Sequence, residues 1–451
     1  MLPLAQIAQG LGHDVAGSDR SYDQGRTPEK FDWLAGSGFS LFPQDGSGIT
    51  TVDQVLIASA AVEDTVPEVA RANDLGCARM SRAELLSQFF NDAGYSLSIG
   101  GTSGKSTVTG MIAWILSEAG HDPTVMNGAV MKNFATDTNP FASARVGSPH
   151  LFVSEVDESD GSIALYTPTI GVLLNVSLDH KSIEELRELF GNYVAESGCA
   201  VINFDNEEAR LLAPRARQMV SFGLTHKDAD ISVEPESIEQ GPLSISAAVL
   251  DNRNREVFPL ILPMPGLHNL SNALAAIAAV SAAGIDVRAA AAALRGFKGL
   301  GRRFDVIGTS ESDVAVIDDF GHNPEKCAAT LRTLKATQGR VIAFFQPHGY
   351  GPLRQMGTEL AETFASELGA EDTTIMCDPV YFGGTVDRSQ GTERIIDLIK
   401  QAGGSAEHIG NRPACADRIV ELAKPGDRIV VMGARDDTLT AFAKDILGRL
   451  S

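Results

Sequence analysis

The sequence predicts an α/β protein with three domains. Short, continuously apolar runs alternate with Ala- and Leu-rich stretches of helical character along the whole chain. The runs that we interpret as strands are residues 54–59, 96–100, 151–156, 169–175, 314–318, 340–345 and 428–433. Apolar strands followed by helices are typical of parallel sheets covered on both faces. A chain of 451 residues also exceeds the size at which one hydrophobic core usually stops growing.

Two segments are candidate domain boundaries. Residues 91–95 (NDAGY) precede a new strand, and residues 298–305 (KGLGRRFD) join a helix to the next strand. They divide the chain into an N-terminal domain (1–90), a central domain (91–299) and a C-terminal domain (300–451), which are ordinary domain sizes.

Composition argues against several classes of protein. The 58 acidic and 37 basic residues give a formal net charge of −21, whereas nucleic-acid binding needs clustered Lys and Arg. No apolar run reaches the roughly 18 residues that span a bilayer, and no signal peptide is evident, so we expect a cytoplasmic protein without a membrane partner. The five scattered cysteines contain no C-x-x-C pair, which argues against a disulfide framework or a thiolate metal site.

The strongest motif is a glycine-rich turn, 99-IGGTSGKST-107, between an apolar strand and a helix. In such a loop the backbone N–H groups surround phosphate oxygens, Lys105 can reach the β- and γ-phosphates, and Ser106 can offer its hydroxyl to Mg²⁺. Ile99 stands where the strict pattern has its first glycine. A turn that only joins strand to helix is the alternative, but the context favours binding of ATP or GTP.

Polar side chains follow the next two strands. The first strand ends in a cluster of carboxylates: Glu155, Asp157, Glu158 and Asp160. Ligands of open α/β sheets bind at the carboxyl ends of strands, and oxygen ligands suit Mg²⁺. A solvated acidic loop is the alternative. Asn175 and His180 follow the second strand, where His180 is either a ligand or an ordinary surface residue.

A series of motifs in order along the chain resembles the Mur ligases, and most strongly the branch that adds L-alanine to UDP-N-acetylmuramate. The motifs are 15-VAGSD-19, 57-IASAA-61, 101-GTSGKST-107, 155-EVDESD-160, 175-NVSLDH-180, 266-GLHNLSNALAA-276, 301-GRRFD-305, 318-DDFGHNP-324, 345-FQPH-348 and 432-MGARD-436. The resemblance implies an ATP-dependent amide ligase of peptidoglycan precursor synthesis that works through an acyl phosphate. It also implies a Rossmann-like UDP-binding N-terminal domain, a central phosphate-loop ATPase domain and a Rossmann-like C-terminal domain.

The resemblance further implies a role for individual residues. ATP would be held by Gly101, Thr102, Ser103, Gly104, Lys105, Ser106, Thr107, Asn269, Arg303, Asp319 and His322. Mg²⁺ would be held by Ser106, Glu155 and His180, and the catalytic residues would be Lys105, Glu155, His180, Arg303 and His348. Within this set Asn269 would contact adenine, Arg303 a phosphate and Asp319 the ribose.

The substrates implied by the resemblance are a UDP-sugar acid and an amino acid or short peptide. The sugar nucleotide would lie at Ser18, Asp19, Ser59 and Asn139, while His322 and His348 would lie near the incoming amine. The protein would be a monomer or dimer. Taken alone, Asn269 could equally begin a capped helix, 318–324 could be a strand-to-helix turn, and Arg303 could be a linker charge.

The chain departs from the family pattern at several points. The first strand and its glycine-rich UDP loop are missing before Met1, through a start codon assigned too late or a true truncation. Ser103, Ser177, Asn323 and Gly349 replace residues typical of the alanine-adding branch. A ligase that recycles a tripeptide therefore remains an alternative, as do a phosphate-loop kinase or hydrolase and a non-catalytic homologue.

Overall fold

The computed structural model describes residues 1–59, 62–177, 182–380, 388, 391–434, 436 and 438–450. The chain forms two compact units. Unit 1 comprises Met1–Ile238, Ser246–Leu262 and Ser271–Lys298, and unit 2 comprises Glu239–Ile245, Pro263–Leu270 and Gly299–Ser451. The division into three domains stays a prediction. Within the described residues, every helix is too short or too polar to cross a lipid bilayer.

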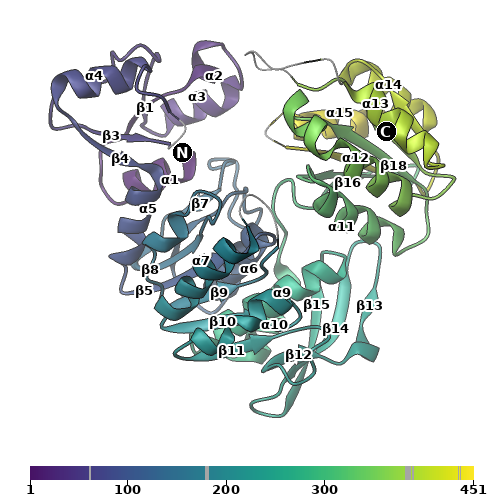
Figure 1. The fold of residues 1–451 in the computed structure, drawn as a ribbon, viewed down its shortest axis with the longest axis horizontal. Coiled ribbons are helices and arrows are strands. Elements are labelled where there is room, and N and C mark those ends of the chain that lie inside the picture. The colour runs from purple at the N-terminus through teal and green to yellow at the C-terminus, as the bar shows by residue number, and fades with distance from the viewer. Residues whose placement is uncertain are drawn as a thin grey trace. The chain divides into compact units, whose positions relative to one another are not determined.

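Unit 1 opens with small α/β elements (Figure 1). They are α1 (Leu2–Gly10), β1 (Ala16–Ser18), α2 (Arg20–Asp23), α3 (Pro28–Gly36), β2 (Ser40–Phe42), β3 (Val55–Ala58), α4 (Pro67–Leu75), β4 (Ala78–Ser81) and α5 (Arg82–Asn91). Strand β1 pairs in parallel with β2, and β3 pairs in parallel with β4, as two separate sheets. Leu4 and Ile7 of α1 and Phe90 of α5 share a buried cluster with Phe152 of the large sheet. Helices α1 and α5 are therefore anchored on the core that follows them.

The large sheet of unit 1 carries the glycine-rich loop. Its strands are β5 (Tyr95–Gly100), β6 (Pro123–Met126), β7 (Ala144–Arg145), β8 (Ser148–Glu155), β9 (Ile170–Leu173), β10 (Cys199–Asn203), β11 (Met219–Phe222), β12 (Ile231–Val233), β14 (Ile245–Asp251) and β15 (Glu256–Leu262). From β14 the order is β14-β12-β11-β10-β9-β5-β8-β6-β7, with β15 on β14. Strand β5 lies between β8 and β9 and is parallel to both, so the carboxyl ends of these three strands meet at one edge of the sheet.

The helices of unit 1 that follow β5 are α6 (Lys105–Glu118), α7 (Ile183–Glu196), α8 (Glu207–Leu211) and α10 (Val287–Ala293), together with much of α9 (Leu267–Ala282). Most side chains of α6 are buried, including Val108, Met111 and Ile112. A helix that is apolar on nearly all sides is covered all round, so α6 lies within the core of the unit. The loop that precedes α6 is therefore fixed on a rigid support.

The large sheet is parallel in its centre, as predicted, and antiparallel toward its edges. Strand β7 is antiparallel to β6, and β14 is antiparallel to β12. Burial alternates along β14 and β15, as in antiparallel strands with one solvent-facing side, whereas β5 and β9 are buried on both faces. In β15 the exposed positions include the apolar Val257 and Ile261, so the alternation in burial is not matched by an alternation of polar and apolar residues in the sequence.

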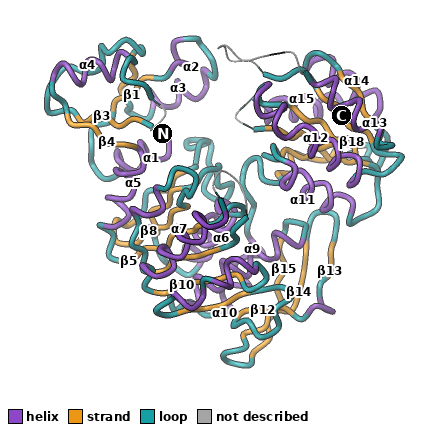
Figure 2. The backbone as a smooth tube through the Cα atoms, in the orientation of Figure 1, coloured by secondary structure: helices purple, strands orange, loops and turns teal. Residues whose placement is uncertain are grey.

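Unit 2 is a doubly wound sheet (Figure 2). Its elements are β16 (Asp305–Thr309), β17 (Ala315–Asp319), α11 (Pro324–Lys335), β18 (Val341–Gln346), α12 (Tyr350–Glu367), β19 (Thr373–Met376), α13 (Thr392–Gln401), β20 (Ala406–His408), α14 (Arg412–Leu422), β21 (Arg428–Gly433) and α15 (Leu439–Arg449). The two-residue strand β13 (Glu239–Gln240) is not part of this sheet. The sheet order is β16-β17-β21-β18-β19-β20, and only the edge pairing of β16 with β17 is antiparallel among the described strands.

Two hydrophobic clusters cover the two faces of the unit 2 sheet. Ala343 and Phe345 of β18 pack with α11, α12 and α13, whereas Ile342 and Phe344 pack with α14 and α15. Successive side chains of a strand point to opposite faces, so a strand that is apolar at every position needs helices on both sides. The predicted Rossmann-like form of this part of the chain is confirmed.

Candidate functional site

The glycine-rich loop lies between β5 and α6, as predicted. Gly101 has φ +136° and Gly104 has φ +86°, a region of backbone conformation that side chains other than glycine rarely adopt. A Cβ atom at Gly104 would lie 2.6 Å from Oδ1 of Asn272. Glycine is therefore required at position 104 for two reasons, the positive φ and the lack of room for a Cβ atom. The sequence motif alone does not show which of the two applies.

The loop is held by the polar residues that follow β9. The Ser103 amide donates to Oδ1 of Asn175 at 2.9 Å, and Nδ2 of Asn175 donates to the Ser103 carbonyl at 3.1 Å. Thr102 Oγ1 accepts from the Ser177 amide at 3.2 Å and donates to the Ser177 carbonyl at 3.3 Å. These reciprocal pairs fix the loop from the neighbouring strand.

The loop has polar groups that suit an anionic ligand. Ser103 Oγ is buried and has no hydrogen-bond partner in the described part of the chain. Gly104 is the N-cap of α6 and cannot cap it with a side chain, so the first N–H groups of the helix face the loop with the positive end of the helix dipole. Thr107, the last residue of the motif, is buried in α6. Such a helix start fits a phosphate.

Lys105 and Ser106 lie against carboxylates that follow or end β8. Lys105 Nζ is 2.6 Å from Oε2 of Glu158, and Ser106 Oγ donates to Oε2 of Glu155 at 2.6 Å. Nδ2 of the buried Asn127 donates to the Ser106 carbonyl at 3.0 Å. A hydroxyl beside a carboxylate is a fitting oxygen donor set for Mg²⁺. His180, the third predicted metal ligand, lies outside the described residues.

Asp157 lies between the two glutamates in sequence and stays ionised. Burial opposes its charge, but hydrogen bonds from Ser159 and the charge of Lys105 outweigh burial and hold the pKa of Asp157 below its usual value. Sequence reasoning noted the acidic cluster but gave Glu158 no role. Its position three residues after Glu155 indicates that Glu158 lies near the site. Its ion pair with Lys105, 53 residues away, could not be predicted from the sequence.

The predicted adenine and ribose residues lie in unit 2. Nδ2 of the buried Asn269 donates to the Pro265 carbonyl at 2.7 Å. Asp319 ends β17, where its Oδ1 accepts from the Phe304 amide at 2.8 Å. Its Oδ2 accepts from the Gly321 amide at 2.9 Å and from Thr330 Oγ1 at 2.8 Å. Asp319 thus connects the segment around residue 304 to β17 and α11.

The two neighbouring arginines have different surroundings. Arg302 donates to the Gly433 carbonyl at 2.6 Å and to Oδ1 of the buried Asp318 at 3.3 Å. Arg303 lies with its guanidinium 4.4 Å from the centre of the Phe320 ring. The Arg302 guanidinium lies 5.2 Å from the centre of the same ring, so the two arginines differ in the hydrogen bonds of Arg302 to Gly433 and Asp318.

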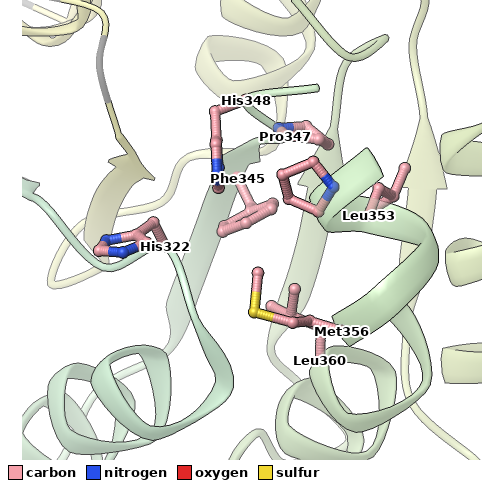
Figure 3. Close-up of a pocket in the computed structure, with 8 residues that line it drawn as sticks. His322, Phe345, Pro347, His348, Leu353, Met356 and Leu360 are labelled. Carbon is pink, nitrogen blue, oxygen red and sulfur yellow. The ribbon is translucent and has the colours of Figure 1, made fainter. Parts of the chain in front are cut away.

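His322 and His348 lie together, with ring centres 5.7 Å apart. Both line a small, partly open pocket (Figure 3). Its other walls are Phe345, Pro347, Pro352, Leu353, Met356 and Leu360. His322 Nδ1 is 3.0 Å from the Phe320 carbonyl. Burial, with a smaller effect of the Lys326 charge, lowers the pKa of His322 to about 4, so its ring is neutral near pH 7.

The predicted sugar-nucleotide residues lie in several loops of unit 1. Ser18 Oγ, at the end of β1, donates to Oε1 of Glu68 at 2.7 Å. Asp19 is the N-cap of α2 and accepts from the Ser21 amide at 2.7 Å. Ser59 follows β3 and is exposed. Asn139 pairs with Thr136 in an isolated bridge, and its Oδ1 is buried without a partner among the described residues.

Comparisons with known proteins give one consistent family. Residues 99–280 match the Mur ligase middle domain, and residues 302–435 match the Mur ligase, glutamate ligase domain. A UDP-N-acetylmuramate–L-alanine ligase of Brucella anthropi is 33% identical over 460 aligned residues, which cover 98% of this chain and 94% of the relative.

Solved structures agree with this assignment. The crystal structure of a UDP-N-acetylmuramate–alanine ligase from Thermotoga maritima shares the fold, with a TM-score of 0.80 at 24% identity over 100% of this chain and 96% of that one. A murein peptide ligase from Psychrobacter arcticus has a TM-score of 0.71 at 25% identity over 100% of this chain and 96% of that one.

Proposed function

The chain belongs to the Mur ligase family, and from this premise we propose that it joins L-alanine to UDP-N-acetylmuramate with ATP as the energy source. The observation that carries the ATP chemistry is the loop after β5, in which Lys105 and Ser106 lie against the carboxylates of Glu158 and Glu155. The choice of substrates is supported by the 33% identity to the Brucella anthropi ligase over nearly the full length of both chains.

The proposed reaction has two steps. The carboxylate of the sugar acid attacks the γ-phosphorus of ATP, and the bond between this phosphorus and the β,γ-bridging oxygen breaks. ADP departs, and the sugar acid becomes an acyl phosphate. The amine of alanine then attacks the acyl carbon, phosphate leaves, the nitrogen loses a proton, and an amide forms. Phosphoryl transfer needs mainly positioning and neutralisation of charge. The reaction therefore calls for fixed donors and cations more than for a strong base.

Unit 1 supplies the phosphate and metal residues in this proposal. The backbone of 101–107 and Lys105 bind the phosphates, and Ser103 Oγ offers a further donor. Ser106, Glu155 and His180 hold Mg²⁺, which supplies neutralisation of the phosphate charge. Ser18, Asp19, Ser59 and Asn139 are proposed to hold the sugar nucleotide.

Unit 2 supplies residues for the base, the ribose and the amine. Asn269 is proposed to contact adenine and Arg303 a phosphate. An ionised carboxylate offers about four acceptor positions, and Asp319 uses three of them internally, which leaves one for a ribose hydroxyl. His322 stays neutral and is proposed to position the amine, together with His348, without repelling an ammonium form.

A second candidate is a ligase that attaches a short peptide to the same sugar acid. It is supported by the likeness to the Psychrobacter arcticus murein peptide ligase and by Asn323 and Gly349, which depart from the alanine-adding pattern. Alanine stays the first candidate because the identity to the Brucella anthropi alanine ligase covers nearly the whole of both chains.

The test of the ATP chemistry is the variant Lys105→Ala, compared with Lys444→Ala, which removes an exposed lysine of α15. Product formed from ATP, UDP-N-acetylmuramate and L-alanine would be measured by mass spectrometry. We expect Lys105→Ala to lose product formation by at least a hundredfold and Lys444→Ala to retain it. Near-normal product formation by Lys105→Ala would refute the assignment of the loop.

A further inference from the structure

The ion pair between Lys105 and Glu158 is the most informative contact of the site. The Lys105 side chain is 18% exposed and that of Glu158 is 8% exposed, with Nζ and Oε2 2.6 Å apart. A carboxylate this well buried needs a partner, because an unpaired buried charge is strongly unfavourable. In the described structure that partner is the lysine to which the nucleotide phosphates are assigned.

The neighbouring carboxylates have other partners. Glu155 accepts from Ser106 Oγ at 2.6 Å. Asp157 accepts from the Ser159 amide at 3.0 Å, and Asp160 accepts from the Ser162 amide at 2.9 Å, so both of these side chains close turns of their own loop. The ion pair with Lys105 is thus the particular contact of Glu158 and not a general property of the acidic cluster.

We propose that Glu158 is a positioning residue that holds Lys105 while no nucleotide is bound and weakens nucleotide binding, because ATP must compete for the lysine. This inference rests on the proposed function of the loop. A phosphate placed at Lys105 brings negative charge next to Glu158 in a partly buried place, where like charges repel more strongly than in water. Either Glu158 moves away from Lys105 or the phosphate binds in spite of the repulsion by the Glu158 carboxylate. Both outcomes raise the dissociation constant of the nucleotide. The same competition assists the release of anionic products from the lysine.

The test is equilibrium binding of the Mg²⁺ complex of the β,γ-imido analogue of ATP, measured by isothermal titration calorimetry without the other substrates. We expect Glu158→Gln, which removes the charge and keeps the shape, to bind the analogue about tenfold more tightly, a difference of about 1.4 kcal/mol. The matched control Asp160→Asn removes the same charge two residues away, from an exposed side chain, and should change affinity less than twofold. Glu158→Asp restores the charge and should bring affinity back toward that of the wild type.

Steady-state kinetics give a second readout. Competition for Lys105 predicts that Glu158→Gln lowers the KM for ATP more than it changes kcat. Unchanged affinity with a large loss of kcat would overturn the inference and place Glu158 in the chemical steps, and equal tightening by Asp160→Asn would reduce the effect to general charge. A wild-type chain that binds no analogue would refute the proposed function itself, whereas firm wild-type binding that Glu158→Gln leaves unchanged would overturn this inference alone.

Discussion

Asp319 connects the segment around Arg303 to the rest of unit 2 through hydrogen bonds. Its replacement by Asn should therefore destabilise this unit. The carboxylate is buried and accepts hydrogen bonds from the Phe304 amide, the Gly321 amide and Thr330 Oγ1. Asparagine has the same shape, but only one of its two terminal atoms accepts. Its NH₂ group must therefore face at least one of these donors.

The expected loss follows from the number of bonds affected. A hydrogen bond to a charged group contributes about 1.5–3 kcal/mol, and a buried donor left without a partner adds to the loss. At least one bond is lost and the others are no longer charge-assisted, so we expect a destabilisation of roughly 2–4 kcal/mol. For a folding unit of 150–250 residues, this corresponds to a decrease in Tm of roughly 5–15 °C.

Differential scanning calorimetry of the full chain measures this decrease, and hydrogen exchange of residues 300–321 locates it. The matched control is Asp417→Asn, which removes an exposed carboxylate paired with Arg449 on the surface of unit 2. Exposed pairs contribute about 0–1 kcal/mol, so the control should melt within about 3 °C of the wild type. An Asp319→Asn variant that melts with the control would show that the three hydrogen bonds do not hold this segment.

Three further predictions concern the loop, the strand β5 that precedes it, and His322 of unit 2. Gly104→Ala should weaken binding of the imido analogue of ATP at least tenfold, whereas Gly120→Ala, with φ +84° but open space around its Cβ, should lower stability by about 1 kcal/mol and leave calorimetric binding intact. Tyr193→Phe removes a buried hydroxyl that lies 2.7 Å from Ser98 Oγ beneath the loop and should cost about 1–2 kcal/mol in urea unfolding. The pKa of His322 is lowered to about 4, so the neutral ring stabilises the folded chain fully above pH 6.5, and this stabilisation is lost as the pH falls toward 4. Over this interval the free energy of unfolding of His322→Asn should therefore fall by about 1–2 kcal/mol less than that of the wild type.

Much of the fold could be predicted because its signals are local. Buried parallel strands are continuously apolar, and the turn at 101–107 combines glycines, Lys105 and Ser106 over a few residues. The placement of Glu155 at the end of β8 also followed from the strand pattern. Strands β14 and β15 were not among the predicted strands, although both are mostly apolar, and the side that each turns outward is set by pairing between strands rather than by a local pattern.

The contacts that complete the site are long-range and could not be predicted. Nothing near Glu158 in sequence indicates that it pairs with Lys105, and nothing in two adjacent arginines indicates which is structural. In the structure Arg302 has φ +59° and donates to the Gly433 carbonyl, while Arg303 lies over Phe320. The contact of Arg302 with Gly433, 131 residues away, could not be predicted from two adjacent arginines.

The central claim is that this chain forms an amide bond to a UDP-sugar acid at the expense of ATP. It is tested most directly by phosphate release from Mg-ATP and UDP-N-acetylmuramate with a panel of single amino acids and a short murein peptide, with the mass of each product. We predict release that depends on L-alanine, stops when either substrate is omitted, and gives one ADP per amide formed. Release without any amine, or no release with any member of the panel from a chain that binds ATP, would contradict the claim.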